Sequence, residues 1–415
     1  MTPVDSLTPS QLSKNVLLGP KKAEFEGGTE GLRGFAALLV LYTHLIYPQP
    51  HVDPVYAPPN ILRALDASQG GVLLFFILSG YVIGLTNRRA LSWPNSKNYL
   101  WRRGLRLFPL YFLAIMVSWA VLPVDGWPAV LGNIFFLQGT FGVPGLVANS
   151  NLWSLNFEAI YYLLFFVIWW RPMLWWLWAG VAAVVGIGAG MSSGGIASVA
   201  PYASGWLYWV IGFGFSRAPK SESPPALPIF SILALWLFTW KVKPLALLLT
   251  LCGIPLESDS MWFGFYAYDF LISSLVMLMA ASERRLSFTK LLIFGSFAIP
   301  VLWTLYRISQ GQFFQGKETF YDVLVLSAFA LIRVKPKFNI FMPLAWFGSI
   351  SYAVYIFQRP VQYFIRDASW LPTGSVAAYL LRVCLIIVIV VCVSWWLEKR
   401  LQPKIRQWVT RDKKI

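Results

Sequence analysis

The chain has few charged residues, histidines or cysteines for its length. Of its 415 residues, 13% are charged, two are histidine, three are cysteine and 57% are hydrophobic. A soluble globular domain has about a quarter of its residues charged, so this composition argues against a soluble protein. An odd number of cysteines without paired spacing gives no disulfide framework. With no CxxC or HExxH pattern, the sequence offers no metal site.

Long apolar runs recur along the whole chain, and the mean hydropathy is +0.60. The short alternating strands of a membrane barrel are absent. Because a membrane-spanning helix needs roughly 20 apolar residues, the sequence predicts an all-α, polytopic transmembrane helical bundle of about 10–12 spans. The expected spans are 31–48, 70–86, 101–122, 151–170, 172–190, 203–216, 227–252, 261–280, 288–306, 319–333, 342–363 and 374–397.

Three parts are expected along the chain: a polar segment 1–30, a membrane domain 31–400 and a basic tail 401–415. The first apolar run lacks a small-residue cleavage site and is expected to be a retained span. The tail is expected to lie against anionic lipid. The run 227–252 is interrupted by lysines, so one long helix, two short helices and a re-entrant pair all remain open. The segment 127–139 is short and is expected at the interface.

The formal charge of +16 comes from basic residues that cluster between apolar runs. Cytoplasmic loops of membrane proteins are enriched in Lys and Arg, so this excess indicates membrane orientation and not nucleic-acid binding. Residues 107–170 contain neither Lys nor Arg, which places the loop 123–150 on the outer side. Both termini are then predicted to be cytoplasmic.

His44 lies in the first apolar run, eleven positions after Arg33. At about 100° per residue, eleven steps end roughly 20° past three turns, so both side chains share one helix face about 16 Å apart. Ionisable residues in a membrane helix usually mark a functional site, and a neutral imidazole is a good general base near pH 7. The alternative is an arginine that snorkels to the helix end and a histidine satisfied inside the bundle.

Three arginines open the third span: Arg102, Arg103 and Arg106. Arg103 and Arg106 are one turn apart and share a face. Guanidinium groups match phosphate oxygens in two-point contacts, so these residues, with Arg33, are candidates for holding a nucleotide-bearing donor. The alternative is ordinary anchoring at the cytoplasmic surface.

Other polar residues interrupt the apolar runs. Glu158 lies in the aromatic segment NLWSLNFEAIYYLLF and is the expected partner of His44; the alternative is an ion pair with an arginine for packing. Ser79 in FFILSGYVI lacks a G-x-S-x-G context, which favours helix packing over nucleophilic catalysis. Arg382, midway along the last span, has no partner that the sequence identifies. His51, in the loop QPHVDP, is expected to be solvated.

Together these segments resemble the membrane acyltransferase-3 family, the integral O-acyltransferases of bacterial surface glycans. The family has an Arg and a His eleven apart, then an LSG helix, an R-x-x-R pair and a W-S-L-x-x-E-x-x-Y-Y-like helix. The matching residues are Arg33, His44, Phe75–Gly80, Arg103, Arg106, Trp153, Ser154, Leu155, Glu158 and Tyr162. The segment 347–360 resembles the family's G-x-x-S-Y-x-x-Y motif, and Glu398 ends the last span. The resemblance covers roughly residues 29–400. The chain departs from the family pattern at two positions. It has Glu30 where Asp is common, and Gln358 where many members have His.

The resemblance implies an acyltransferase for groups other than amino-acyl groups, in the bacterial cytoplasmic membrane. It would move an acyl group, often acetyl, from acyl-CoA to a hydroxyl of a carbohydrate, exopolysaccharide or lipopolysaccharide, with no tightly bound cofactor. His44 would be the catalytic base, oriented by Glu158. Residues expected at the donor are Arg33, Arg102, Arg103 and Arg106; those expected at the substrate are Trp153, Tyr162 and Ser79. The rival is a proton-coupled transporter or flippase for a lipid-linked glycan or anionic solute, disfavoured because no internal repeat is visible.

Overall fold

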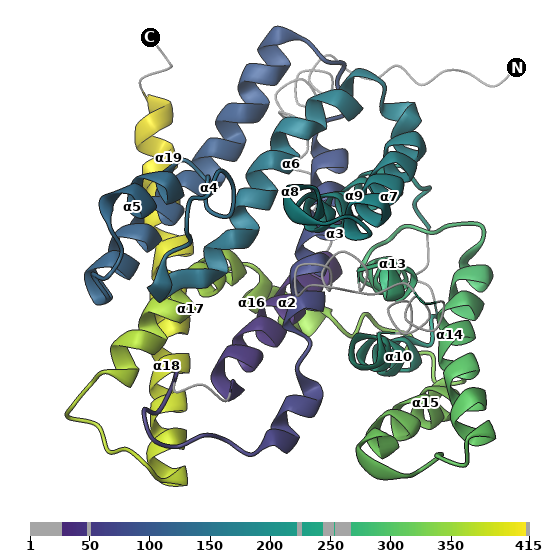
Figure 1. Cartoon of the computed structure of the whole chain (residues 1–415). Helices are drawn as coiled ribbons and strands as arrows, with labels where there is room; N and C mark the ends of the chain where they lie inside the picture. Colours follow the sequence, from purple (N-terminus) through teal and green to yellow (C-terminus); the bar gives the residue numbers. More distant parts are fainter. Residues whose placement is uncertain (1–26, 48–50, 222–225, 244–252, 254–266, 412–415) are drawn as a thin grey trace, which may run out of the picture.

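The computed structural model describes residues 27–47, 51–221, 226–243, 253 and 267–411, and in these residues the regular structure is helical throughout (Figure 1). The helices are α2 (Gly27–Ile46), α3 (Ser68–Thr86), α4 (Trp93–Val121), α5 (Trp127–Ile134), α6 (Trp153–Trp170), α7 (Trp175–Gly190), α8 (Gly194–Ala197), α9 (Val199–Phe215), α10 (Ile229–Val242), α13 (Leu271–Ala281), α14 (Thr289–Ser309), α15 (Thr319–Leu331), α16 (Ala345–Gly348), α17 (Ser351–Arg366), α18 (Val376–Trp396) and α19 (Gln402–Arg411). The prediction of an all-α protein is confirmed.

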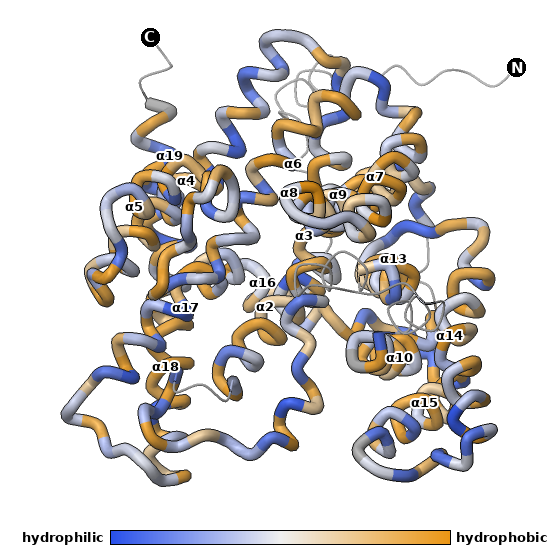
Figure 2. Tube along the Cα trace, viewed as in Figure 1, coloured by the Kyte–Doolittle hydropathy of each residue, from blue (hydrophilic) through white to orange (hydrophobic). Residues whose placement is uncertain are grey.

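Each predicted span contains a helix, and the short segment after residue 126 forms the separate helix α5. Among the described helices, six are long and apolar enough to cross a membrane, and α10, α13 and α15 are apolar but shorter. Figure 2 shows the apolar residues along the helices and the hydrophilic ones mainly at their ends and connections. The protein is therefore a multi-pass membrane protein.

The interrupted run 227–252 contains one helix, α10, which ends at Val242. Lys243, the residue after it, has a left-handed backbone with φ of 53°. That conformation terminates a helix because the right-handed hydrogen-bond pattern cannot continue through it. The remainder of this run, on which the predictions of two short helices and of a re-entrant pair depend, lies outside the described residues.

The segments predicted to be cytoplasmic meet at one end of the bundle. The indole of Trp169 donates to the carbonyl of Arg89 at 2.8 Å, and the amide of Ser221 donates to the carbonyl of Glu283 at 2.8 Å. Helix α19 is at the same end, uppermost in Figure 1, while the connection from α14 to α15 is at the opposite end. The basic connections thus share one side, as positive-inside orientation requires.

Glycine lets α3 and α9 approach closely. A Cβ on Gly80 would lie 1.8 Å from the carbonyl oxygen of Trp209, and a Cβ on Gly212 would lie 1.9 Å from that of Ile77. Small residues at such crossings bring helix backbones together in membranes. The expectation that the LSG segment serves helix packing therefore holds for Gly80. Because α3 is in close contact with α9 at Gly80, the position of the neighbouring Ser79 on α3 is fixed as well.

Arg382 is fully buried in α18, and its hydrogen-bond partners are backbone carbonyls. Its guanidinium donates to the carbonyls of Pro372 at 3.0 Å and Leu371 at 3.0 Å, and also to that of Ile365. Its Nε lies 3.9 Å from a carboxylate oxygen of Asp53. The last carbonyls of a helix have no partner within the helix, so this arginine caps α17 and holds the turn that follows it.

Candidate functional site

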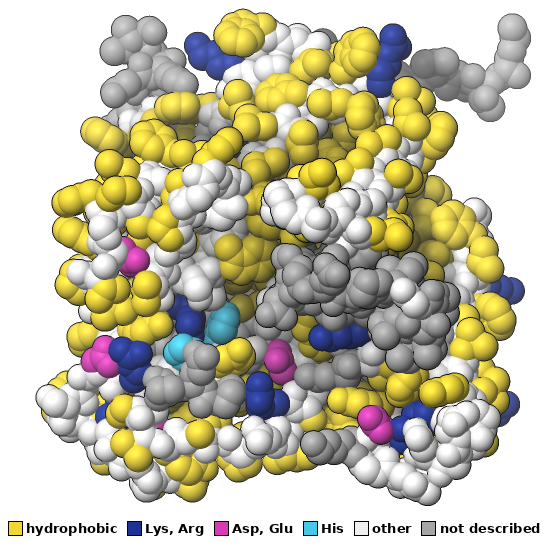
Figure 3. Space-filling model, viewed as in Figure 1, with side chains coloured by type: hydrophobic (Ala, Val, Ile, Leu, Met, Phe, Trp, Pro, Cys, Tyr) yellow, Lys and Arg dark blue, Asp and Glu magenta, His cyan; other side chains and the backbone are white. Residues whose placement is uncertain are grey.

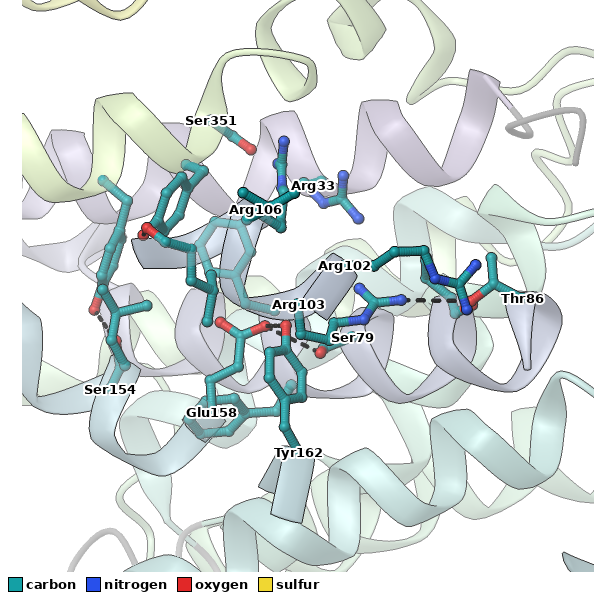
Figure 4. Close-up of a pocket in the computed structure, with 18 of the residues that line it drawn as sticks. Arg33, Ser79, Thr86, Arg102, Arg103, Arg106, Ser154, Glu158, Tyr162 and Ser351 are labelled. Atoms are coloured by element: carbon teal, nitrogen blue, oxygen red, sulfur yellow. Dashed lines mark hydrogen bonds between the residues drawn. The ribbon is translucent and has the colours of Figure 1, made fainter. Parts of the chain in front are cut away.

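A cavity of about 860 Å³ lies between α2, α3, α4, α6, α17 and α19. Its walls include apolar side chains such as Val72 and Phe76 and hydroxyls such as Ser79 and Tyr162 (Figure 4). The volume is in the range typical of small-molecule and cofactor sites, roughly 300–1,000 Å³. The ionisable side chains that line it are Glu30, Arg33, Arg102, Arg103, Arg106, Glu158, Tyr162, Tyr352, Tyr355 and Arg406. Five arginines against two glutamates make the cavity basic.

Arg102 and Arg103 contact neutral groups only. Arg102 donates to the Asn87 side-chain oxygen at 3.0 Å, and Arg103 donates to the Thr86 hydroxyl at 3.4 Å. Within the described part of the chain, neither forms an ion pair with a carboxylate, and the buried Nε of Arg103 has no hydrogen-bond partner. Arg103 is partly buried and Arg102 is exposed, and a cation without an anion at a cavity is well placed to take one from a ligand.

Arg33 and Arg106 are already paired. Arg33 lies 2.8 Å from Glu30 on the same helix, and Arg106 lies 3.2 Å from Glu398, whose side chain is only 3% exposed. The guanidinium of Arg106 also lies 5.6 Å from the ring centre of Tyr352. The arginines expected at the donor thus share the cavity but differ in charge, because two of the four are locally neutralised.

Glu158 pairs with α3 and with its own helix, and not with His44. Its carboxylate accepts hydrogen bonds from the Ser79 hydroxyl at 3.1 Å and from the Tyr162 hydroxyl (Figure 4). No hydrogen bond or ion pair joins Glu158 to His44 among the residues described. The reason is packing: α3 packs against α2 and reaches Glu158 with Ser79.

Tyr162 connects this carboxylate to the arginines. Its ring centre lies 5.6 Å from the guanidinium carbon of Arg103, within the range of a cation–π interaction. One turn before Glu158 on α6, the hydroxyl of Ser154 lies 2.7 Å from that of Tyr355 on α17. Figure 4 shows the Glu158, Tyr162 and Ser79 side chains meeting inside the cavity. The cavity therefore has a basic end and an end lined by hydroxyls and a carboxylate.

His44 lies beyond the cavity, beside Gln358 and Arg359 of α17. The residues that line the cavity include Arg33 but, in the described part of the chain, not His44. Two of the cavity's aromatic residues lead toward it: Phe75 and Tyr355 have ring centres 5.8 Å apart, and Gln358 donates to the Tyr355 carbonyl at 3.2 Å. The shared face of α2 thus has Arg33 in the cavity and His44 further along the helix.

The three residues expected at the substrate are separated. Ser79 and Tyr162 line the cavity. Trp153 is not among the described residues that line it, and its ring packs edge-on against Phe157 at 5.0 Å. The residue after it, Ser154, lines the cavity instead, because successive positions at a helix start point in directions about 100° apart.

Three residues that line the cavity are not among the site residues expected from the sequence: Tyr352, Tyr355 and Arg406. Tyr352 and Tyr355 belong to the G-x-x-S-Y-x-x-Y segment, whose spacing of three places both on one face of α17. Arg406 belongs to the tail that is expected against lipid, but it lines the cavity. Its helix α19 packs on α4, where the Gln402 side chain donates to the Leu105 carbonyl. A basic cluster so close to the last span is the signal that points to Arg406.

The family model described as "Acyltransferase domain" matches residues 27–399, most of the chain. The match begins with α2 and ends just before α19, so it includes every helix that lines the cavity except the last. Comparison with curated proteins and with solved structures gives no match.

Proposed function

The chain belongs to the membrane acyltransferase-3 family, and on that premise we propose that it moves an acyl group, acetyl in the simplest case, from acyl-CoA to a hydroxyl of a carbohydrate or polysaccharide precursor. The observation that carries the proposal is the pair Arg102 and Arg103, which line a basic cavity without a carboxylate partner among the described residues. The bacterial cytoplasmic membrane is the proposed location, with the basic end of the bundle facing the cytoplasm.

The donor would bind with its phosphates at the basic end. Guanidinium forks hold phosphate oxygens in two-point contacts, and Arg102 and Arg103 have donor capacity to spare. Arg406 from α19 would close the same end. The pantetheine arm, which is uncharged, would extend past Val72 and Phe75, so that the thioester arrives near Tyr355 and the start of the polar face of α17.

His44 would act as the general base. The acceptor oxygen attacks the thioester carbonyl while His44 takes the hydroxyl proton; the tetrahedral intermediate then expels the CoA thiolate, which the imidazolium protonates. One C–O bond forms, one C–S bond breaks, and the proton moves from oxygen to sulfur. Gln358 lies beside the imidazole, and we assign it, in place of Glu158, the role of orienting the ring.

Glu158 would position the donor end of the cavity. Its carboxylate accepts a hydrogen bond from the Tyr162 hydroxyl and so holds that ring beside Arg103. It also accepts a hydrogen bond from the Ser79 hydroxyl, which links α6 to α3. A carboxylate at this depth also offsets part of the arginine charge when no donor is bound. Its proposed effect on catalysis is thus indirect and passes through Tyr162 and Arg103.

The test is release of free CoA from acetyl-CoA by purified protein, with envelope carbohydrate as acceptor. Wild type, His44→Ala, Arg103→Ala and the control Arg89→Ala are compared, since Arg89 is exposed and does not line the cavity. We expect acceptor-dependent release, loss of turnover in the His44 variant, a raised KM for acetyl-CoA in the Arg103 variant and no change in the control. Full turnover by His44→Ala refutes the base. Proton-driven solute uptake into proteoliposomes without CoA release favours the carrier instead.

A further inference from the structure

Polar side chains that are buried but unsatisfied gather near the outer end of α17. Gln358 and Gln362 are 0% exposed and Arg359 is 7% exposed. Gln358 lies beside the imidazole of His44, but Arg359 Nε, Gln362 Nε2 and Nδ1 of the neighbouring His51 have no hydrogen-bond partner in the described part of the chain. Leaving a buried polar atom without a hydrogen bond is unfavourable, so three such atoms beside one buried guanidinium indicate a ligand site.

The charge of this cluster is positive and uncompensated. Arg359 forms no ion pair with a carboxylate in the described part of the chain; its one hydrogen bond, at 3.4 Å, goes to the amide oxygen of Gln362. The other nearby cation, Arg366, is already paired with Asp367 at 2.6 Å. A buried guanidinium without an anion is unfavourable, and a ligand that brings an anionic group would correct it.

Aromatic rings border the cluster. The ring centre of Tyr363 lies 5.6 Å from the Arg359 guanidinium and 6.1 Å from the His51 ring, and Tyr47 stacks on His51 at 5.8 Å. The expectation that His51 is solvated is wrong, because these contacts leave it half-buried. Figure 3 shows histidine side chains on this face beside basic ones. Flat apolar faces next to a cation suit a sugar ring with an acidic substituent.

We propose that this outer cluster binds the acceptor, and that the acceptor is an anionic sugar, with a carboxylate or phosphate close to the hydroxyl that receives the acyl group. The residues of the outer cluster are His44, His51, Gln358, Arg359, Gln362 and Tyr363. The inference rests on the proposed acyl transfer, because the anionic sugar would be the acceptor whose hydroxyl His44 deprotonates.

The position of Arg359 separates it from the donor arginines. It is one helical turn beyond Tyr355, which lines the cavity, and so about 6 Å further along α17 toward the outer connections. The donor arginines lie on α2, α4 and α19 at the basic end. An anion at Arg359 therefore arrives from the outer side, with His44 between it and the thioester.

The first test is binding of glucose, glucuronate and glucose 6-phosphate to the full-length protein in nanodiscs of zwitterionic lipid. Intrinsic tryptophan fluorescence reports binding to wild type, Arg359→Gln, Arg359→Lys and Arg103→Gln. We expect at least one charged sugar to bind about tenfold or more tightly than glucose, the gain from one charge-assisted hydrogen bond. Which charged sugar is preferred distinguishes carboxylate from phosphate.

The variants decide whether Arg359 is responsible. The preference for charge should disappear in Arg359→Gln, persist in part in Arg359→Lys and be unchanged in Arg103→Gln, which alters the donor cavity. The proposal is overturned if wild type binds glucose and both charged sugars alike, or if Arg359→Gln keeps the preference.

The second test uses labelled acetyl-CoA and envelope carbohydrate separated by anion exchange into neutral and anionic fractions. Label in the anionic fraction supports the proposal. Label in the neutral fraction overturns the proposal but is compatible with acyl transfer. An equal fall in kcat for both fractions in Arg359→Gln also overturns it, because Arg359 would then stabilise the oxyanion of the reaction itself. Charge-selective binding without any CoA release would support an anion site at the outer cluster. It would refute acyl transfer, and therefore also the role of the bound sugar as acceptor.

Discussion

The hydroxyl of Ser79 on α3 donates to the carboxylate of Glu158 on α6 at 3.1 Å, across a wall of the cavity. The same carboxylate accepts from Tyr162, whose ring lies 5.6 Å from the Arg103 guanidinium carbon. Three helices are thereby joined at the point where the basic part of the cavity ends. Because Arg103 has no carboxylate partner among the described residues, its guanidinium is positioned by the Thr86 hydroxyl and by the rings of Tyr162 and Tyr99.

Tyr162→Phe should raise the KM for acetyl-CoA because it frees the ring that borders Arg103. The effect should be non-additive with Arg103→Gln: residues that act through one contact show an interaction energy of about 0.5–3 kcal/mol in a double-mutant cycle. The measurement is the KM for acetyl-CoA in the two single variants and the double variant.

Tyr208→Phe is the matched control for that cycle. Tyr208 is also buried, and its hydroxyl donates a hydrogen bond to the Ala267 carbonyl at 2.6 Å, which the substitution removes. Among the described residues, it does not line the cavity. It should leave the KM for acetyl-CoA unchanged and add independently to Arg103→Gln. Strict additivity of Tyr162→Phe with Arg103→Gln would contradict the role assigned to Tyr162.

Arg103 and Arg106 should respond differently to the same substitution. Arg103→Gln should weaken acetyl-CoA binding roughly 10- to 100-fold with little loss of stability, because no ion pair is broken. Arg106→Gln leaves Glu398 buried and unpaired, which should destabilise the fold by about 2 kcal/mol.

The second substitution Glu398→Gln separates the two effects. It removes the unpaired carboxylate, so the double variant Arg106→Gln/Glu398→Gln should regain most of the lost melting temperature in a thermal unfolding assay. It should not regain acetyl-CoA affinity if Arg106 also contacts the donor. Equal stability of Arg103→Gln and Arg106→Gln would show that the pair with Glu398 contributes little.

Much of the cavity lining can be predicted from the sequence alone. Arg33, Ser79, Arg103 and Glu158 stand out because they are ionisable or small polar residues in apolar runs, and because the order of their segments resembles that of a family. Each of these positions lines the cavity. Helix periodicity is sufficient to say that such residues share faces within one helix.

Contacts between helices are beyond that reasoning. The partner of Glu158 depends on the close crossing of α3 and α9 at Gly80, which presents Ser79. The hydrogen-bond partners of Arg382 are carbonyls of the backbone, which no side-chain pattern reveals, and its ion-pair partner Asp53 is more than 300 positions away in the chain. The cluster at Arg359 arises where α17 passes α2, two helices more than 300 positions apart in the chain. Such contacts follow from tertiary packing and not from local spacing.

Arg382→Met should be among the most destabilising single changes in the last span. It removes the donors for the carbonyls of Pro372 and Leu371 and leaves them unsatisfied in a buried region, at about 3 kcal/mol or more. Thermal unfolding in detergent measures the loss. Arg366→Met is the control, because its half-exposed pair with Asp367 is worth less than about 1 kcal/mol. Similar losses in both variants would rule out the capping role.

His51 should make the protein sensitive to mild acid. Burial, and then repulsion from Arg359 and Arg366, lowers the pKa of His51 to about 4, whereas an unfolded histidine has a pKa of about 6.5. As the pH falls from about 6.5 toward 4, the unfolded chain binds a proton that the folded chain does not, so stability decreases; above this window His51 has no such effect. His51→Gln should therefore match wild type in melting temperature at pH 7.5 and exceed it at pH 5. Thermal unfolding between pH 4.5 and 7.5 is the measurement, and parallel curves for the two proteins would exclude His51 as the titrating group.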